Sequence, residues 1–176
     1  MKKYTQGLCL SVLLSFGVSA HTHTHGQGEL LVAQDGHTLQ MQFIIPADDA
    51  LNVERTADSA TKQEAINVLA NKLHTSHYIV DTNGQCVLQS SYNSLNTEHE
   101  EHAHQNAHSD KSEDSHEHHD IEATYTFNCK TTVNRFSITL FELMPSLNSL
   151  SMQWINNSDQ GLLKITRNQP VINWQS

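Results

Sequence analysis

The stretch TLQMQFIIP, residues 38–46, decides the fold, because apolar and polar side chains alternate along it. The apolar positions recur with a period of two: Leu39, Met41, Phe43 and Ile45. This period predicts a strand with one buried face. Asp35-Gly36 lies directly before it and predicts a hairpin with ELLVA, residues 29–33, while Pro46 predicts the end of the strand. The chain therefore opens with a β-hairpin that faces a core.

The period then changes to that of a helix. Residues 60–74 carry apolar side chains at positions i, i+3, i+4 and i+7: Ile66, Leu69, Ala70 and Leu73. Thr61 and Glu64 have the spacing of a capping box. We expect an amphipathic helix whose apolar stripe packs on the sheet.

Two further strand-like stretches each contain a cysteine. QCVLQSSY, residues 85–92, follows Asn83-Gly84, which predicts a hairpin with a strand before it. ATYTFNC, residues 123–129, alternates again. An antiparallel register that sets Cys86 opposite Cys129 pairs Leu88 with Phe127, Ser90 with Tyr125 and Tyr92 with Ala123. A cross-strand disulfide is then possible. The alternative is a pair of thiolate metal ligands, although there is no Cys-x-x-Cys knuckle.

The C-terminal part predicts more strands. Alternation recurs at Phe136, Ile138 and Leu140, and again at Leu150, Met152 and Trp154. We expect a turn or short helix at residues 142–149 and one or two closing strands in residues 160–174. The predicted fold class is α+β: a mainly antiparallel β-sheet of seven to nine strands, one principal helix and a long disordered His-rich loop.

That loop is EHEEHAHQNAHSDKSEDSHEHHD, residues 98–120, which has almost nothing apolar to bury and is expected to be flexible. It contains seven of the thirteen histidines: His99, His102, His104, His108, His116, His118 and His119. Imidazole is a ligand that suits Zn²⁺, Cu²⁺ and Ni²⁺. The close spacing favours several overlapping, exchanging metal sites over one tetrahedral site. A purely solvating loop is the alternative, but solvation needs no histidine.

The N-terminus reads as a secretory signal peptide, residues 1–20, with Lys2 and Lys3 before an apolar run and Val18-Ser19-Ala20 as the cleavage site. The mature single domain, residues 21–176, then begins with HTHTHG. The free amine with His21 and His23 could bind Cu²⁺ or Ni²⁺. Alternatively, His21, His23 and His25 alternate and could join a tetrahedral Zn²⁺ site.

Charge and motifs exclude several classes of function. The net charge is −9, and it becomes −11 when the signal removes Lys2 and Lys3. Such a chain attracts cations and does not bind nucleic acid by neutralising phosphates. The apolar run is too short to span a bilayer, and no later run is apolar enough, so we expect no membrane insertion after cleavage. No catalytic motif is present, so no enzyme is predicted. His74 and His77 are expected to cap a helix end, and His37 to be incidental.

Several of these stretches together resemble the ZrgA-type zinc-uptake family, which was long catalogued only as a domain of unknown function. They are the histidine pair before Gly26, residues 29–47, the His-rich loop, EATYTFNC (residues 122–129) and the LFELMPSLNSL…MQWI…QGLL tail. The resemblance covers nearly all of the mature chain. It implies an exported protein of Gram-negative bacteria, linked to zinc acquisition beside an ABC-type importer, with His23, His25 and the loop histidines as ligands. One departure matters: where the family usually has a Gly-Phe-Glu-His-like stretch, residues 48–58 retain Glu54 but contain no histidine.

The sequence therefore predicts a periplasmic zinc-binding accessory protein that captures or buffers Zn²⁺ and feeds an uptake system. Its partners would be metal ions and components of the ABC-type zinc importer. Two alternatives remain open. One is a copper- or nickel-binding or detoxification protein that uses His21-Thr22-His23, and the other is a protein-interaction module that binds no metal.

Overall fold

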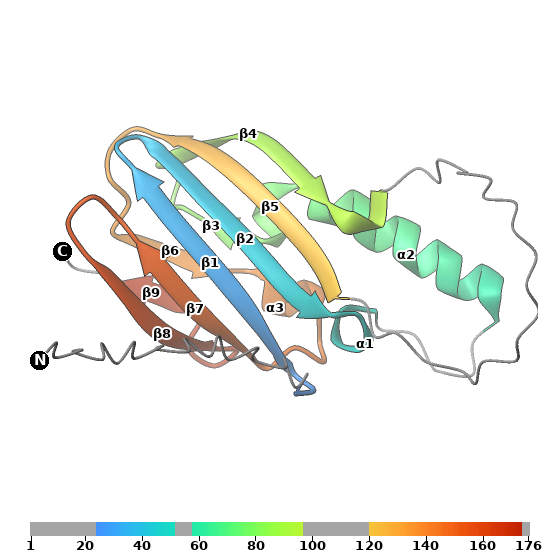
Figure 1. The fold of residues 1–176 in the computed structure, drawn as a ribbon. Helices are drawn as coiled ribbons and strands as arrows, with labels where there is room; N and C mark the ends of the chain where they lie inside the picture. The colour runs from blue at the N-terminus through green and yellow to red at the C-terminus, as the bar shows by residue number, and fades with distance from the viewer. Residues whose placement is uncertain (1–23, 52–57, 97–119, 174–176) are drawn as a thin grey trace, which may run out of the picture.

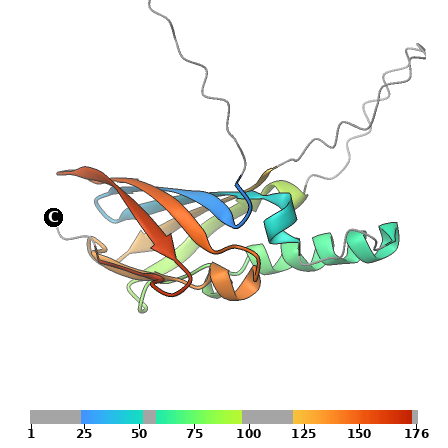
Figure 2. The ribbon, with the colours of Figure 1, turned by 90° about the horizontal axis from the view of Figure 1, so that it is seen from below.

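The fold consists of two packed layers. A computed structural model describes residues 24–51, 58–96 and 120–173. These residues form nine strands, three α-helices and two short 3₁₀ helices (Figure 1). Figure 2 shows the larger sheet as one layer and the helices with a smaller sheet as the other. The predicted α+β class is confirmed, but the strands form two sheets, whereas the sequence predicts one.

The larger sheet has six strands. Their spatial order is β4 (Cys86–Asn93), β5 (Asp120–Cys129), β2 (Thr38–Pro46), β1 (Gln27–Asp35), β7 (Ser149–Ile155) and β8 (Gln160–Thr166). All neighbours are antiparallel except β1 and β7, which run parallel. The first strand of the chain therefore lies inside the sheet, between its hairpin partner and a strand from the C-terminal part.

The β1–β2 hairpin forms as the alternation predicts. Asp35 pairs with Thr38 around Gly36, whose φ of 54° lies in the left-handed region that glycine tolerates. The four alternating apolar side chains of β2 are all buried, and Pro46 ends the strand. The period-two pattern thus selects the face of the sheet that meets the core.

The second layer closes that core. It contains α2 (Ser59–Leu73), α3 (Leu140–Leu143) and a three-stranded sheet in the order β3 (Val80–Asp81), β6 (Arg135–Ile138) and β9 (Val171–Asn173). The shorter elements are α1 (Ala47–Ala50), η1 (Ser76–Tyr78) and η2 (Ser94–Asn96). Both closing strands predicted from the C-terminal residues are present as β8 and β9. Leu140 begins α3 instead of extending a strand, so the short helix begins two residues before the predicted range and overlaps its start.

The Asn83-Gly84 hairpin prediction is wrong. Both residues have positive φ, 53° and 69°, so the turn itself forms. The strands on its two sides, however, belong to different sheets: Val80 of β3 pairs with β6, and Cys86 of β4 pairs with β5. The turn therefore connects the two layers.

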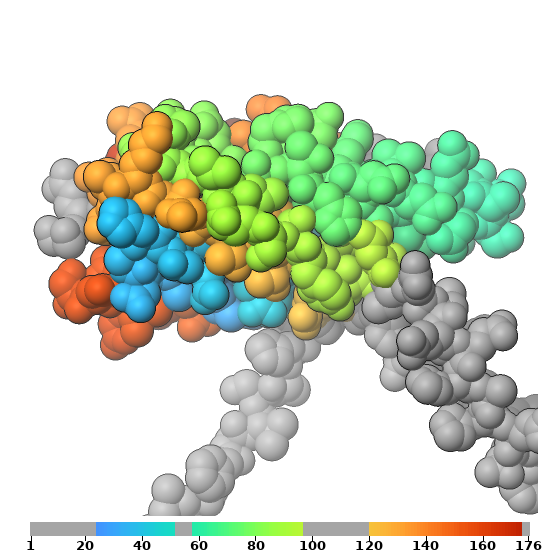
Figure 3. All heavy atoms as spheres, turned by 90° about the horizontal axis from the view of Figure 1, so that it is seen from above, coloured from blue at the N-terminus to red at the C-terminus, as the bar shows by residue number. Residues whose placement is uncertain are grey.

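Helix α2 is anchored at its C-terminal half. Leu69, Ala70 and Leu73 are buried, whereas the first part of the helix is exposed and extends beyond the sheet (Figure 3). The predicted capping box is wrong. The N-cap is Asp58, whose carboxylate accepts a hydrogen bond from the Thr61 backbone amide at 2.7 Å.

Strands β4 and β5 carry the disulfide. Cys86 and Cys129 are paired across the strands and bonded, as predicted, so they are not a pair of thiolate ligands. The Leu88 pairing is confirmed as well. Beyond it a β-bulge shifts the register, and Ser91, not Ser90, lies opposite Tyr125. The predicted partners of Ser90 and Tyr92 are therefore wrong: Asn93 faces Ala123, and Tyr92 is 54% exposed.

Candidate metal site

The described strand ends that adjoin the two histidine-rich segments of the sequence lie at one end of the larger sheet. We call it the loop end: β1 begins there at Gln27, β2 ends at Pro46, β4 ends at Asn93 and β5 begins at Asp120 (Figure 1). Pro46 and Asp120 are direct cross-strand partners. The N-terminal segment enters the fold at this end, and the segment between Asn96 and Asp120 leaves from it and returns to it.

Gly26 fixes the point at which the N-terminal segment joins the sheet. It is buried, and its carbonyl oxygen accepts hydrogen bonds from the backbone amides of Asn148 at 2.8 Å and Ser149 at 3.0 Å. Its φ is +77°, and a Cβ atom there would lie 2.5 Å from the Asn148 side-chain nitrogen. This backbone conformation favours glycine, and the exposed His25 directly precedes it in the chain.

Asp49 is the residue that the sequence reading missed. It lies in α1 directly after β2, its side chain is 5% exposed, and its Oδ2 accepts the Gly26 N–H at 2.6 Å. Its carboxylate contacts the backbone amide of the residue after His25, and carboxylates join imidazoles as oxygen ligands of zinc. The only sequence signal was an aspartate pair after Pro46, which by itself does not distinguish a buried side chain from an exposed one.

Of the predicted metal ligands, the structure describes His25 alone. The other nine lie outside the described residues: His21, His23, His99, His102, His104, His108, His116, His118 and His119. Glu54 lies outside them as well. Within the described ranges, no three His, Cys, Asp or Glu side chains come close enough together to hold a metal ion.

The remaining described histidines make local contacts. His37 is exposed at the opposite end of the sheet, and its Nδ1 lies 2.8 Å from the Cys129 carbonyl oxygen. His74 is the C-cap residue of α2, as predicted, and its ring contacts β4 and η2. The ring of His77 packs against Tyr78, with 4.0 Å between the ring centroids.

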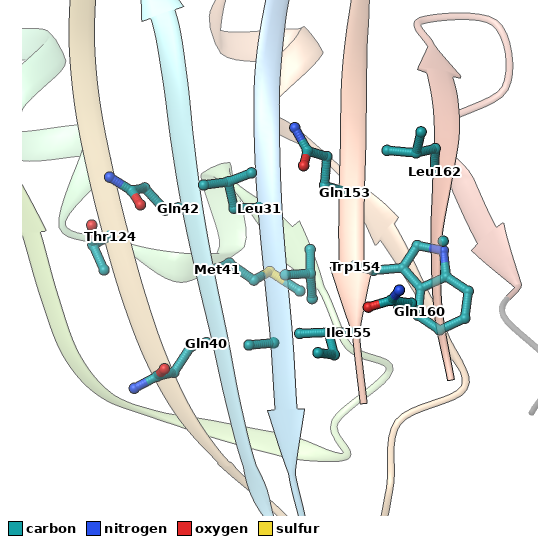
Figure 4. A pocket seen from close by; sticks show the side chains of 13 residues that line it. Leu31, Gln40, Met41, Gln42, Thr124, Gln153, Trp154, Ile155, Gln160 and Leu162 are labelled. Atoms are coloured by element: carbon teal, nitrogen blue, oxygen red, sulfur yellow. The ribbon is translucent and has the colours of Figure 1, made fainter. Parts of the chain in front are cut away.

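A separate concavity of about 660 Å³ lies over strands β1, β2, β5, β7 and β8 (Figure 4). Its lining consists of glutamine, threonine and apolar side chains, including Gln42, Gln153 and Leu162, and it contains no His, Cys, Asp or Glu. This surface therefore offers none of the usual zinc ligands. Across the described residues, no helix is both long enough and apolar enough to span a membrane.

Comparison with known proteins assigns the family. No curated protein matches the chain. A family model described as ZrgA family zinc uptake protein matches residues 22–174, which is most of the chain and includes the histidine-rich loop and all of the N-terminal histidine-rich segment except His21. The match confirms the resemblance drawn from the sequence, and the chain belongs to the ZrgA family of zinc uptake proteins.

Proposed function

We propose that this protein is a periplasmic zinc-binding accessory protein that captures or buffers Zn²⁺ and feeds it to an ABC-type uptake system. It is a binding protein and not an enzyme. The proposed ligands are the histidines of the two rich segments: His21, His23, His25, His99, His102, His104, His108, His116, His118 and His119. One observation carries the proposal: the topology joins both segments to the same end of the sheet.

The spacing at the loop end supports a shared site. One strand, β2, separates the starts of β1 and β5, so these starts are about 10 Å apart at the usual spacing of strands. An extended chain advances about 3.3–3.6 Å per residue. Two or three extended residues next to His25, or next to Asp120, are therefore enough for the N-terminal segment and the loop segment to reach one ion. Loop histidines could collect Zn²⁺ and pass it to the N-terminal histidines without a large movement.

Charge supports the capture of cations at the loop end. The loop end carries Asp48, Asp49, Asp120 and Glu122 in a chain whose net charge is −9. Such a field raises the local concentration of cations. Asp49 is the proposed oxygen ligand, because its hydrogen bond ties it to the residue that directly follows His25.

The proposed compartment is supported by independent features. The Cys86–Cys129 disulfide is typical of proteins in oxidising compartments such as the periplasm. Residues 1–20 have the pattern of a signal peptide, which would direct export and leave His21 as the first residue.

A metal titration tests the proposal. The chain beginning at His21 is titrated with Zn²⁺, Cu²⁺ and Ni²⁺ beside a variant in which a glycine–serine linker of equal length replaces residues 98–119. The linker spares Asp120, the first residue of β5, and keeps the loop length while removing the ligands. We expect it to remove most Zn²⁺ equivalents and leave one tighter site. That site should weaken in His25→Ala and persist in the control His37→Ala, which changes an exposed histidine at the opposite end.

Asp49 is tested by two substitutions. Asp49→Asn keeps an oxygen that can accept the Gly26 N–H but removes the charge, whereas Asp49→Ala leaves that buried amide without its acceptor. We expect the asparagine variant to fold and to bind Zn²⁺ more weakly. Unchanged affinity would make Asp49 a structural acceptor only.

Two results would contradict the proposal. If Zn²⁺ binds negligibly to every form and only the free-amine form binds Cu²⁺ or Ni²⁺, the protein is a copper or nickel binder. If cells carrying the linker variant grow normally in zinc-poor medium, the loop does not serve zinc uptake and the interaction-module alternative gains.

A further inference from the structure

The connection between α3 and β7 receives the start of β1. Two consecutive backbone amides, those of Asn148 and Ser149, donate to the Gly26 carbonyl oxygen at 2.8 and 3.0 Å. The Gly26 N–H donates in turn to Asp49 Oδ2 at 2.6 Å. We call residues 144–149 the socket. They belong to LFELMPSLNSL, residues 140–150, a stretch that carries the family resemblance and has no part in the metal site proposed above.

The socket needs hydrogen-bond donors from elsewhere in the chain. Helix α3 ends at Leu143 and β7 begins at Ser149, so most of the socket belongs to neither a helix nor a strand. The carbonyl oxygens at and beyond the end of a helix have no partner within it and must find other donors. The buried side chains of Met144 and Leu147 attach the socket to the core but supply no donor.

Arg167, which directly follows β8, supplies these donors. Its Nη1 donates to the Phe141 carbonyl oxygen at 2.5 Å. Its Nη2 lies within hydrogen-bond distance of three more carbonyl oxygens, those of Met144 at 2.8 Å, Pro145 at 2.8 Å and Leu147 at 2.6 Å. Since Nη2 carries two hydrogens, one of them is shared between two of these oxygens. One guanidinium thus binds the backbone along nearly the whole length of the socket.

Arg167 also lies at the loop end of the sheet. Thr166, the last residue of β8, pairs with Ser149, which pairs with Gln27 of β1. The Arg167 backbone amide donates to the Asn148 carbonyl oxygen at 3.0 Å. Arg167 therefore contacts the same residue, Asn148, whose own amide binds Gly26.

Capping of α3 alone does not account for these contacts. A cap would involve the carbonyl oxygens of the helix end, such as those of Phe141 and Met144, whereas Pro145 and Leu147 lie beyond it. The planar guanidinium presents five N–H donors in a fixed fork, and lysine has one nitrogen. The fork suits an arginine that fixes the shape of the socket.

We propose that Arg167 is a positioning residue for the proposed metal site: it holds the socket in the shape that receives Gly26, and Gly26 joins the N-terminal histidine segment to Asp49. The proposal rests on the proposed function in assigning His25 and Asp49 to zinc. Without the fork, the two amides that bind Gly26 lose their fixed direction, and the contact with Asp49 loosens with them.

Hydrogen exchange of the metal-free chain tests the positioning. Arg167→Lys keeps the charge and removes the fork. We expect the amides of Gly26, Asn148 and Ser149 to exchange about 10- to 100-fold faster, the effect of losing one hydrogen bond from a charged donor. Amides of the central strands β2 and β5 should keep their rates. The matched control, Arg135→Lys, changes an exposed arginine of β6 and should leave every rate unchanged.

A zinc titration of the same variants tests the link to the metal. Residues that orient metal ligands typically contribute about 10- to 100-fold in affinity. Arg167→Lys should weaken the tight site by about this factor and leave the Zn²⁺ equivalents bound by the loop histidines unchanged. Arg135→Lys should change neither.

Three results would overturn the proposal. Unchanged exchange at Gly26 would mean that the socket keeps its shape without the fork. Equal acceleration in β2 and β5 would make Arg167 a stabiliser of the whole fold. Faster exchange at Gly26 with unchanged affinity of the tight site would separate the socket from the metal.

A measurement on the unaltered chain decides the matter if Arg167→Lys does not fold. NMR of the arginine side chains should show separate, solvent-protected Nη hydrogens for Arg167, and averaged signals like those of the exposed Arg135 would overturn the proposal. Failure of the proposed function is distinguishable from these results. It appears as the absence of a tight zinc site in the unaltered chain, which would remove the link to the metal while the exchange rates still report on the socket.

Discussion

Removal of the Cys86–Cys129 disulfide should destabilise the fold strongly and leave zinc capture intact. The bond joins residues 43 positions apart. In the chain-entropy treatment, releasing a loop of that length from the unfolded state costs about 4 kcal/mol of stability. Domains of this size typically have only about 5–15 kcal/mol in total. The loss would therefore be a large share of the free energy of unfolding.

Zinc binding should survive because the disulfide and the two strand ends that flank the histidine-rich segment in the sequence lie at opposite ends of the β4–β5 pair. Cys86 begins β4 and Asn93 ends it, a span of about 23 Å at the usual rise of a strand. The hydrogen bonds between the strands hold the loop end together independently of the sulfurs. The double variant Cys86→Ala/Cys129→Ala should therefore keep its Zn²⁺ equivalents wherever it remains folded.

Urea denaturation of the metal-free protein provides the measurement, with the chemically reduced chain as a second route to the same state. Deleting residues 98–119 shortens the separation to about 21 positions and should lower the contribution of the disulfide by about 0.6 kcal/mol. The equal-length linker should not lower it. A loss below about 1 kcal/mol in the double variant would refute the unfolded-state reasoning, and a parallel loss of zinc would refute the separation of the two ends.

Three further predictions concern single residues. Tyr125→Phe removes the hydrogen bond from the buried phenol to the Leu73 carbonyl oxygen, 2.7 Å long, and should cost about 1–2 kcal/mol in urea denaturation. Burial already raises the pKa of Tyr125 far above its usual range, so the loss should be the same from pH 6 to 9. Gly26→Ala should cost at least about 1 kcal/mol, because φ is +77° and a methyl group collides with Asn148, and thermal melting would measure it. The Thr61 backbone amide, which donates to the Asp58 carboxylate, lowers the pKa of that carboxyl below 3.8. The Asp58 carboxylate therefore stabilises α2 fully above pH 3.8, and this stabilisation is lost as the pH falls through the lowered pKa. Asp58→Asn should remove this pH dependence, which a series of melting temperatures at different pH values would measure.

Alternation and the cysteine pair were enough to predict the centre of the fold. The period-two stretches became β2, β5 and β7 with their apolar sides buried, and Cys86 and Cys129 paired as their spacing allows. These features can be predicted because successive side chains of a strand point to opposite faces of the sheet, so alternate residues share one face.

The errors arose where one extra residue or a longer-range partner decides the outcome. The bulge after Leu88 reverses which residues of β4 face the core from that point on, and nothing in the local sequence marks the bulge. The Asn83-Gly84 turn forms, but the tertiary contacts of the strands on either side determine that they join different sheets. Asp58 caps α2 in place of the predicted Thr61, since an aspartate three residues earlier is the better acceptor.

The candidate site was predictable in composition but not in place. The histidine-rich segments are evident from the sequence, whereas the attachment of both to one end of the sheet depends on β1 lying two positions from β5. The burial of Asp49 and the contact of His74 with Ser91 could not be read from the sequence. Each depends on a contact between elements more than 15 residues apart, Gly26 with Asp49 and His74 with Ser91.

The interior position of β1 has a consequence for biogenesis. Its parallel partner β7 comes from residues 149–155, so the first strand to emerge cannot be enclosed on both sides until nearly the whole chain is available. Contacts between such distant parts of a sequence form slowly. The β1–β2 hairpin can form early, but the sheet cannot close around β1 until β7 follows. If the chain is exported unfolded, as the proposed function implies, the order of strands would delay completion of the sheet until most of the chain has crossed the membrane.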